Sequence, residues 1–253
     1  MTSLDALIVG ADTVLDQYAL VFPRVAAVIA FLPAFGERSI PGRVRLGLAV
    51  CFVLVLTPMI ADDLAPPVAA SGWIAIILVE ILIGTFLAMI IRLLVLALQT
   101  AGAIAAQATS LSQLFGGAAA DPLPALGNIL LLGGLTLFIM SGLHLRAIEF
   151  LYGSYSLLPL GTLPNSQIVA EWGIGQVARS FALAFMLAFP FVVIAVAYNL
   201  VIGIINRAMP QLMVSLVGAP AISLATLALL AVMSPIILLR WHEAIAVLIV
   251  SLN

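Results

Sequence analysis

Three ionisable side chains, Arg24, Glu80 and Arg92, lie inside long apolar stretches of the sequence. An ionisable group at the centre of a bilayer costs about 2.5–3.5 kcal/mol on insertion scales, so each needs a protein or water neighbour. Gly84 and Ala88 follow Glu80 at helical spacing, a narrow face of small residues that suits close helix contact. Arg92 lies about 120° around a helix from Glu80, so the two do not pair within one helix. Glu80 is therefore either a proton or ion site, or a buried polar contact to another helix or subunit.

A second polar face is predicted near the C-terminal third of the chain. Four residues fall within about 80–100° of one another on a helix, namely Asn199, Gly203, Asn206 and Arg207. Pro210 and Gln211 follow directly and precede another apolar run, which predicts a hairpin between two helices. The face is either a polar turn at the membrane interface or a docking surface for another chain.

Side chains able to support catalysis or metal binding are scarce. The chain has no lysine, which removes the P-loop lysine and the Schiff-base lysine. His144 and His242 are isolated, and His144 is expected to cap a helix or form a hydrogen bond at its end. Cys51, the single cysteine, lies in an apolar run, where a small buried hydrophobe is expected. We predict no enzyme activity, no cofactor and no metal site.

The composition identifies the solvent around most of the chain. Of the 253 residues, 64% are apolar and 8% are charged, with a mean hydropathy of +1.30, whereas a soluble domain has roughly 45–50% and ~25%. The continuous apolar runs favour helices over barrel strands, which alternate polar and apolar residues. A net charge of −2 and the absence of a charged tail give no indication of nucleic-acid binding. The sequence therefore predicts an integral helical membrane protein.

Six apolar runs predict six hydrophobic helical segments. They lie at about 18–35, 46–61, 73–98, 125–143, 181–205 and 212–239. The helix-compatible stretch 73–108 would reach roughly 54 Å, so it must protrude from the bilayer, break or fold back. Residues 152–180 form the longest polar insert. We predict an all-α fold of helical hairpins with broken or kinked helices, in one membrane-embedded domain spanning residues 1–253.

Arginines are concentrated in the segment 36–45. Pro41 with the glycine after it predicts a turn between two helices, and Arg38, Arg43 and Arg45 would keep that turn in water. The positive-inside rule puts 36–45 and 206–211 on the cytoplasmic side and the acidic N-terminal region outside. The arginines either set the topology alone or contact a neighbouring subunit, because their forked guanidinium groups suit carboxylates at interfaces.

The stretch 95–122 is unsuited to face lipid. It contains little bulk, repeated amides such as Gln107 and Gln113, and a break at Gly116 and Gly117. Small polar segments at membrane depth are tolerated where they pack on protein or line a cavity. We therefore expect this stretch to face a pore or an interface.

Four segments together resemble the FliR family, the R subunit of the flagellar type III export gate, whose virulence-injectisome relatives are the SctT proteins. The four are GERSIPGRVRLGLAV (36–50), AGAIAAQATSLSQLFGGAAADP (101–122), GLHLRAIEFLYGSYSLLPLG (142–161) and LVIGIINRAMPQLMVSLVGAPAISL (200–224). The last resembles the family's helical hairpin and is the most specific. Their order and spacing also fit, so the resemblance covers nearly the whole chain.

The resemblance implies a non-enzymatic channel component in the bacterial inner membrane, within the flagellar basal body. Such proteins assemble with P and Q subunits into a closed helical ring, partly raised above the membrane lipids, and a B subunit docks on the cytoplasmic side. Unfolded flagellar proteins pass through the ring. In the family, the segment matching 106–122 projects into the pore as a plug.

These implications give two groups of candidate residues. The pore and plug candidates are Gln107, Ser110, Ser112, Gln113, Phe115, Gly116, Gly117 and Asp121. The subunit-interface candidates are Arg38, Pro41, Arg43, Arg45, Glu80, Arg92, His144, Asn199, Arg207, Pro210 and Gln211.

Three alternatives remain open at the level of sequence, and one of them is a purely structural scaffold that lines no pore. A secondary transporter would use Glu80 and Arg92 as coupling groups, although the inverted repeats that favour transporters are not found. An export-gate subunit of a virulence injectisome would share the fold and differ in its cargo.

Overall fold

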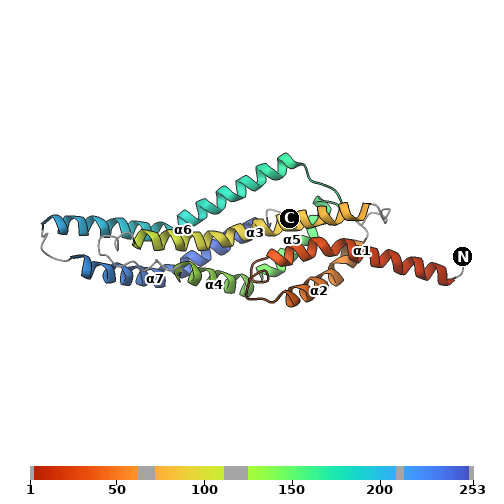
Figure 1. The fold of residues 1–253 in the computed structure, drawn as a ribbon, viewed down its shortest axis with the longest axis horizontal. Coiled ribbons are helices and arrows are strands. Elements are labelled where there is room, and N and C mark those ends of the chain that lie inside the picture. Colours follow the sequence, from red (N-terminus) through yellow and green to blue (C-terminus); the bar gives the residue numbers. More distant parts are fainter. Residues whose placement is uncertain (1–2, 62–71, 111–124, 209–213, 251–253) are drawn as a thin grey trace. The chain divides into compact units, whose positions relative to one another are not determined.

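A computed structural model describes residues 3–61, 72–110, 125–208 and 214–250, and every regular element in these ranges is a helix (Figure 1). The helices are α1 (Ser3–Phe31), α2 (Gly42–Ile60), α3 (Trp73–Ser110), α4 (Ala125–Met140), α5 (Leu143–Leu157), α6 (Ser166–Ala208) and α7 (Val214–Val250). Helix α1 begins well before the first apolar run, so the acidic N-terminal segment is largely helical too.

Five of the helices in the described ranges, α1, α2, α3, α6 and α7, contain windows long and apolar enough to cross a membrane. Helices α4 and α5 pass the same test as a pair that bends by 69° at a short break. Gly142 forms this break with a φ of +74°, a left-handed conformation that glycine adopts without steric cost. The predicted all-α membrane fold with about six segments, one of them broken, is confirmed.

Helix α3 is continuous over 38 residues. At 1.5 Å per residue it is about 57 Å long, and a bilayer core is about 30 Å thick. Of the three outcomes expected for this stretch, a break and a fold-back inside the helix do not occur, so part of the helix extends beyond a bilayer of ordinary thickness.

The segment 152–180, described above as the longest polar insert, is helical over most of its length. Helix α5 continues to Leu157 and helix α6 already begins at Ser166, which leaves a short connection between them. The polar residues Gln167, Glu171 and Arg179 are exposed on α6, and so are large apolar residues such as Ile168 and Ile174. Scattered polar residues are compatible with a helix, and a search for uniformly apolar runs overlooks such a helix.

Cys51 is exposed, contrary to the expectation of a buried small hydrophobe. It lies on α2, which packs against α1 with its other side (Figure 1). The same exposed surface carries large apolar side chains, among them Leu54, Val55 and Met59. Sequence hydropathy does not separate a lipid-facing or subunit-facing position from a core position, because both are apolar.

The contacts within the chain divide it into two compact units. The first unit comprises the described parts of residues 1–92, 138–174 and 246–253, and the second comprises those of 93–137 and 175–245. Buried aliphatic residues of α1, α3 and α5, such as Val25, Ile83 and Leu151, form the core of the first unit.

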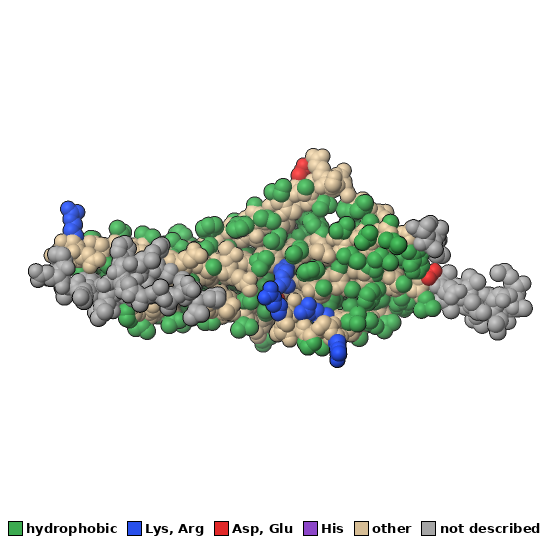
Figure 2. All heavy atoms as spheres, viewed as in Figure 1, with side chains coloured by type: hydrophobic (Ala, Val, Ile, Leu, Met, Phe, Trp, Pro, Cys, Tyr) green, Lys and Arg blue, Asp and Glu red, His purple; other side chains and the backbone are tan. Residues whose placement is uncertain are grey.

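The core of the second unit centres on Trp241, which is fully buried. Its indole Nε1 donates a hydrogen bond of 2.7 Å to the carbonyl oxygen of Leu94. Gly134 lies against Trp241 and Leu98, and Gly102 lies against the backbone at Gly127, so small residues set close packing of α3 with α4 and α7. The face of the molecule seen in Figure 2 is largely hydrophobic, with few charged side chains among the described residues.

Candidate functional site

Arg24 of α1 and Glu80 of α3 form an ion pair inside the first unit. Arg24 Nε donates to Glu80 Oε2 at 2.6 Å, and Arg24 Nη2 donates to Glu80 Oε1 at 3.1 Å. Both side chains are 0% exposed. This two-pronged arrangement is the strongest geometry available to a guanidinium and a carboxylate.

The turn after α5 supplies the remaining partners of the pair. Arg24 Nη2 also donates to the carbonyl oxygen of Leu158 at 2.9 Å, and Arg24 Nη1 donates to the carbonyl and hydroxyl oxygens of Ser154, each at 3.3 Å. The backbone N–H of Gly161 donates to Glu80 Oε1 at 2.9 Å. The ion pair therefore fastens the α5–α6 turn to α1 and α3.

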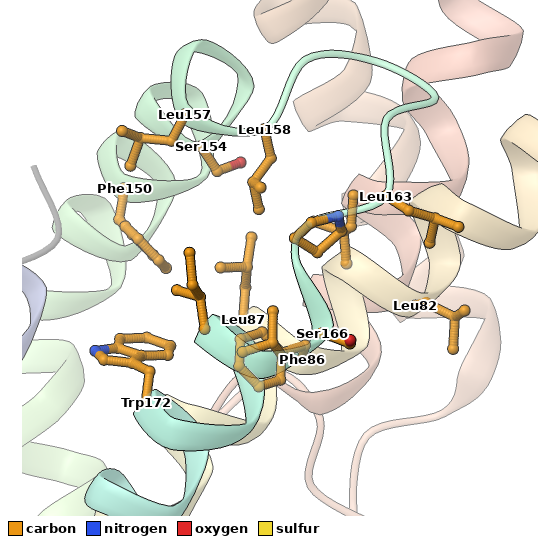
Figure 3. A pocket seen from close by; sticks show the side chains of 14 residues that line it. Leu82, Phe86, Leu87, Phe150, Ser154, Leu157, Leu158, Leu163, Ser166 and Trp172 are labelled. Carbon is orange, nitrogen blue, oxygen red and sulfur yellow. The ribbon is translucent and has the colours of Figure 1, made fainter.

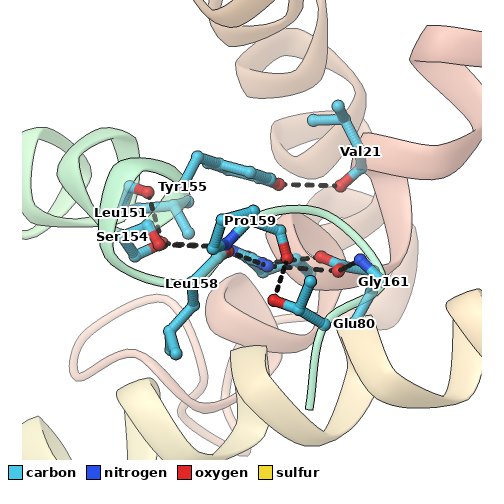
Figure 4. Close-up of polar contacts among 10 residues, drawn as sticks. Val21, Glu80, Leu151, Ser154, Tyr155, Leu158, Pro159 and Gly161 are labelled. Carbon is cyan, nitrogen blue, oxygen red and sulfur yellow. Dashed lines mark hydrogen bonds and ion pairs between the residues drawn. The ribbon is translucent and has the colours of Figure 1, made fainter. Parts of the chain in front are cut away.

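Tyr155 covers the guanidinium from one side. The Cζ atom of Arg24 lies 4.0 Å from the centroid of the Tyr155 ring, within the range of a cation–π contact. The Tyr155 hydroxyl donates a hydrogen bond of 3.4 Å to the carbonyl oxygen of Val21 (Figure 4). The ring thus shields Arg24 while its polar end remains satisfied.

Gly84 allows α1 and α3 to approach closely beside the pair. A Cβ atom at this position would lie 2.5 Å from the carbonyl oxygen of Arg24 and 2.9 Å from the Cβ of Ala27. Such distances are too short for any side chain, so the backbones meet only because position 84 is glycine. The small face predicted after Glu80 serves this contact.

Of the two interpretations of Glu80, the geometry fits the contact to another helix. Both carboxylate oxygens accept hydrogen bonds from protein donors, Arg24 and the Gly161 N–H. Arg92 lies about 18 Å further along the axis of α3, so it forms no joint site with Glu80. Among the described residues, no cluster of three or more acidic, histidine or cysteine side chains could hold a metal ion.

Arg92 instead contacts the turn between α1 and α2. Its Nη1 donates to the carbonyl oxygen of Phe31 at 3.3 Å and lies 3.8 Å from Glu37 Oε1. The Arg92 and Glu37 side chains are 27% and 23% exposed. Arg92 is therefore tolerated in an apolar helix because its guanidinium group reaches the polar turn between α1 and α2.

The arginines of the segment 36–45 divide into two kinds. Arg45 folds back on its own turn, since its Nη2 donates to the carbonyl oxygens of Glu37 and Ile40 at 2.8 and 3.0 Å. Arg38 and Arg43 are exposed. Pro41 immediately precedes the first residue of α2, as the predicted turn requires. An interface role for the exposed arginines remains a prediction.

His144 lies in the first turn of α5 and does not cap it in the predicted way. Its Nδ1 is buried and has no hydrogen-bond partner among the described residues. The imidazole ring meets Phe35 edge-on, with 6.2 Å between the ring centroids. Packing against an aromatic ring, rather than a hydrogen bond, holds this histidine.

Helix α6 carries the second polar face in the second unit. Asn199, Gly203 and Arg207 line a hollow of about 500 Å³ together with Val196, Leu200 and Ile204. Arg207 is exposed and forms no ion pair within the described ranges. Pro210 and Gln211 lie outside the described residues, between the end of α6 and the start of α7.

Most of the plug candidates lie outside the described residues. Gln107 is exposed near the end of α3, and Ser110 is the last residue of that helix. The other candidates lie outside the described residues; they are Ser112, Gln113, Phe115, Gly116, Gly117 and Asp121.

Comparison with known proteins identifies the family. Residues 15–247 match the family described as bacterial export proteins, family 1. The chain belongs to this family. A flagellar biosynthetic protein FliR of Caulobacter vibrioides is 32% identical over 228 residues, which cover 89% of this chain and 91% of that protein. The FliR of Escherichia coli K12 is 31% identical, with 88% and 86% covered. The predicted membership of the FliR family is confirmed, and the transporter and injectisome alternatives are not favoured.

Membership in the export family, together with several helices able to span a membrane, makes the chain a multi-pass protein of the bacterial inner membrane. The ion-pair cluster gives part of the family-like sequence a physical purpose. Ser154, Tyr155, Leu158 and Gly161 all lie in the segment 142–161 that resembles the family, and all touch Arg24 or Glu80.

Sequence reasoning picked out Arg24 and Glu80 separately and did not link them to each other or to this segment. Two lone opposite charges in separate apolar runs are the signal that could have suggested the pair.

Proposed function

We propose that the chain is the R-type subunit of a flagellar protein export gate, with a structural role in forming the conduit rather than an enzymatic one. The observation that carries the proposal is the family match over residues 15–247, together with flagellar relatives that align over about nine-tenths of both chains. We further propose that residues 1–253 act as one membrane-embedded domain.

The proposed partners are the P and Q subunits within the membrane complex and the B subunit on the cytoplasmic side. Two surfaces support an assembly of this kind. The exposed side of α2 carries contiguous large apolar residues, and α6 presents Asn199 and Arg207 beside a hollow. A polar pair on an otherwise apolar helix favours contact with another polypeptide over contact with lipid.

We propose that the segment 110–120 closes the conduit when no cargo passes. This proposal rests on sequence, because small residues and amides predominate there and Gly116 and Gly117 interrupt the helical pattern. The cargo would be unfolded flagellar proteins.

Deletion of the chromosomal copy tests the main proposal. We expect loss of swimming and of flagellar hook and filament proteins in the medium, both restored by the full chain in trans. Normal swimming and secretion in the deletion strain would contradict a role in flagellar export. Loss of injectisome cargo with intact flagella would assign the chain to the other export system.

A pull-down tests the partners. The chain, tagged at its native locus, is solubilised in mild detergent and the co-purifying membrane proteins are identified by mass spectrometry. We expect two other small helical export proteins in one large complex. A stable monomer or homodimer that is active in solute uptake would contradict the gate.

A conductance measurement tests the plug. Deletion of residues 116–119 should raise the leak of ions and small solutes in cells that assemble the gate. An unchanged leak, with the complex present at normal abundance, would show that this segment does not seal the conduit.

A further inference from the structure

We draw no further inference here: the strongest candidate, the apolar pocket of about 510 Å³ that Phe86, Phe150 and Trp172 line between α3, α5 and the start of α6 (Figure 3), carries none because nothing in the structure shows what covers it.

Discussion

Arg24 and Arg207 are both arginines on long apolar helices, and their surroundings are opposite. Arg24 is fully buried and donates to a carboxylate, a hydroxyl and two backbone carbonyl oxygens of its own chain. Arg207 is exposed beside a hollow on α6 and has no ion pair within the described ranges. The comparison indicates that the first charge serves the fold and the second is available to another molecule.

The two regions also differ in how they use glycine. Gly84 beside Arg24 lets two helices meet, and any side chain there would collide with the Arg24 carbonyl oxygen. Gly203 on the face of Arg207 has nothing within 4 Å of the position of a Cβ. A small residue with open space beside it, next to an arginine without an ion pair in the described ranges, suits the close approach of a helix from another chain.

Loss of the buried carboxylate should produce the largest effect. Glu80→Gln leaves Arg24 inside the first unit without its counter-charge, and removing one partner of a buried pair costs about 3–5 kcal/mol. We expect a marked fall in membrane abundance and in the thermal unfolding midpoint in detergent. Glu149→Gln on the exposed side of α5 is the control and should change neither.

The double variant Arg24→Met with Glu80→Leu sharpens this prediction. Replacing both charges with apolar residues removes the uncompensated charge and should recover much of the stability. The Gly161 N–H and the Leu158 carbonyl oxygen then lose their partners, so the α5–α6 turn should become more accessible to proteolysis. A double variant as unstable as Glu80→Gln would mean that the cost lies in packing and not in charge.

A pair of matched glycine substitutions gives the next largest effect. Gly84→Ala forces α1 and α3 apart, and overpacking of this kind costs about 1–3 kcal/mol. Gly203→Ala meets open space and replaces a poor helix former, so it should stabilise the isolated chain by up to about 1 kcal/mol. Thermal unfolding in detergent measures both. Equal destabilisation by the two variants would remove the distinction between the regions.

The sequence was sufficient for the fold class because apolar runs report membrane helices directly. The sequence was insufficient where a helix contains several polar residues, because such a segment lacks a continuous apolar run. The first turns of α6 contain Gln167 and Glu171, so the segment was described as a polar insert, but these residues are exposed on a helix. Cys51 shows the converse error, since an apolar neighbourhood does not reveal whether a position faces a core or a lipid or subunit surface.

The candidate site was predictable only in part. Lone charges in apolar runs identified Arg24, Glu80 and Arg92 as residues that need partners. Identifying those partners required the structure, because Arg24 and Glu80 are 56 positions apart in the sequence. The turn that supplies their other hydrogen-bond partners lies beyond position 150. Spacing along one helix indicates which residues do not pair, whereas it carries no information about which helices become neighbours.

Charge reversal at Arg207 tests the exposed side of the comparison. Arg207→Glu should change the free energy of unfolding of the isolated chain by less than about 0.5 kcal/mol, the usual range for surface sites. In the pull-down, recovery of the other export subunits should fall about tenfold, as expected when an interfacial arginine is lost. Arg207→Lys retains the charge and should retain part of the recovery. Full recovery with Arg207→Glu would show that this face is not an interface.

The smallest effect is expected at the turn between α1 and α2. Arg38→Glu with Arg43→Glu changes only exposed side chains, and exposed ion pairs contribute about 0.2–1 kcal/mol each, so a modest drop in complex recovery and in secreted protein is predicted. Arg45→Glu is the informative comparison, because Arg45 holds the carbonyl oxygens of Glu37 and Ile40. It should lower the stability of the chain itself. The distinction between an arginine that stabilises the fold and arginines that contact a partner would fail at this turn on the reverse result. That result is lower stability in the Arg38→Glu, Arg43→Glu variant and a defect in assembly alone in Arg45→Glu.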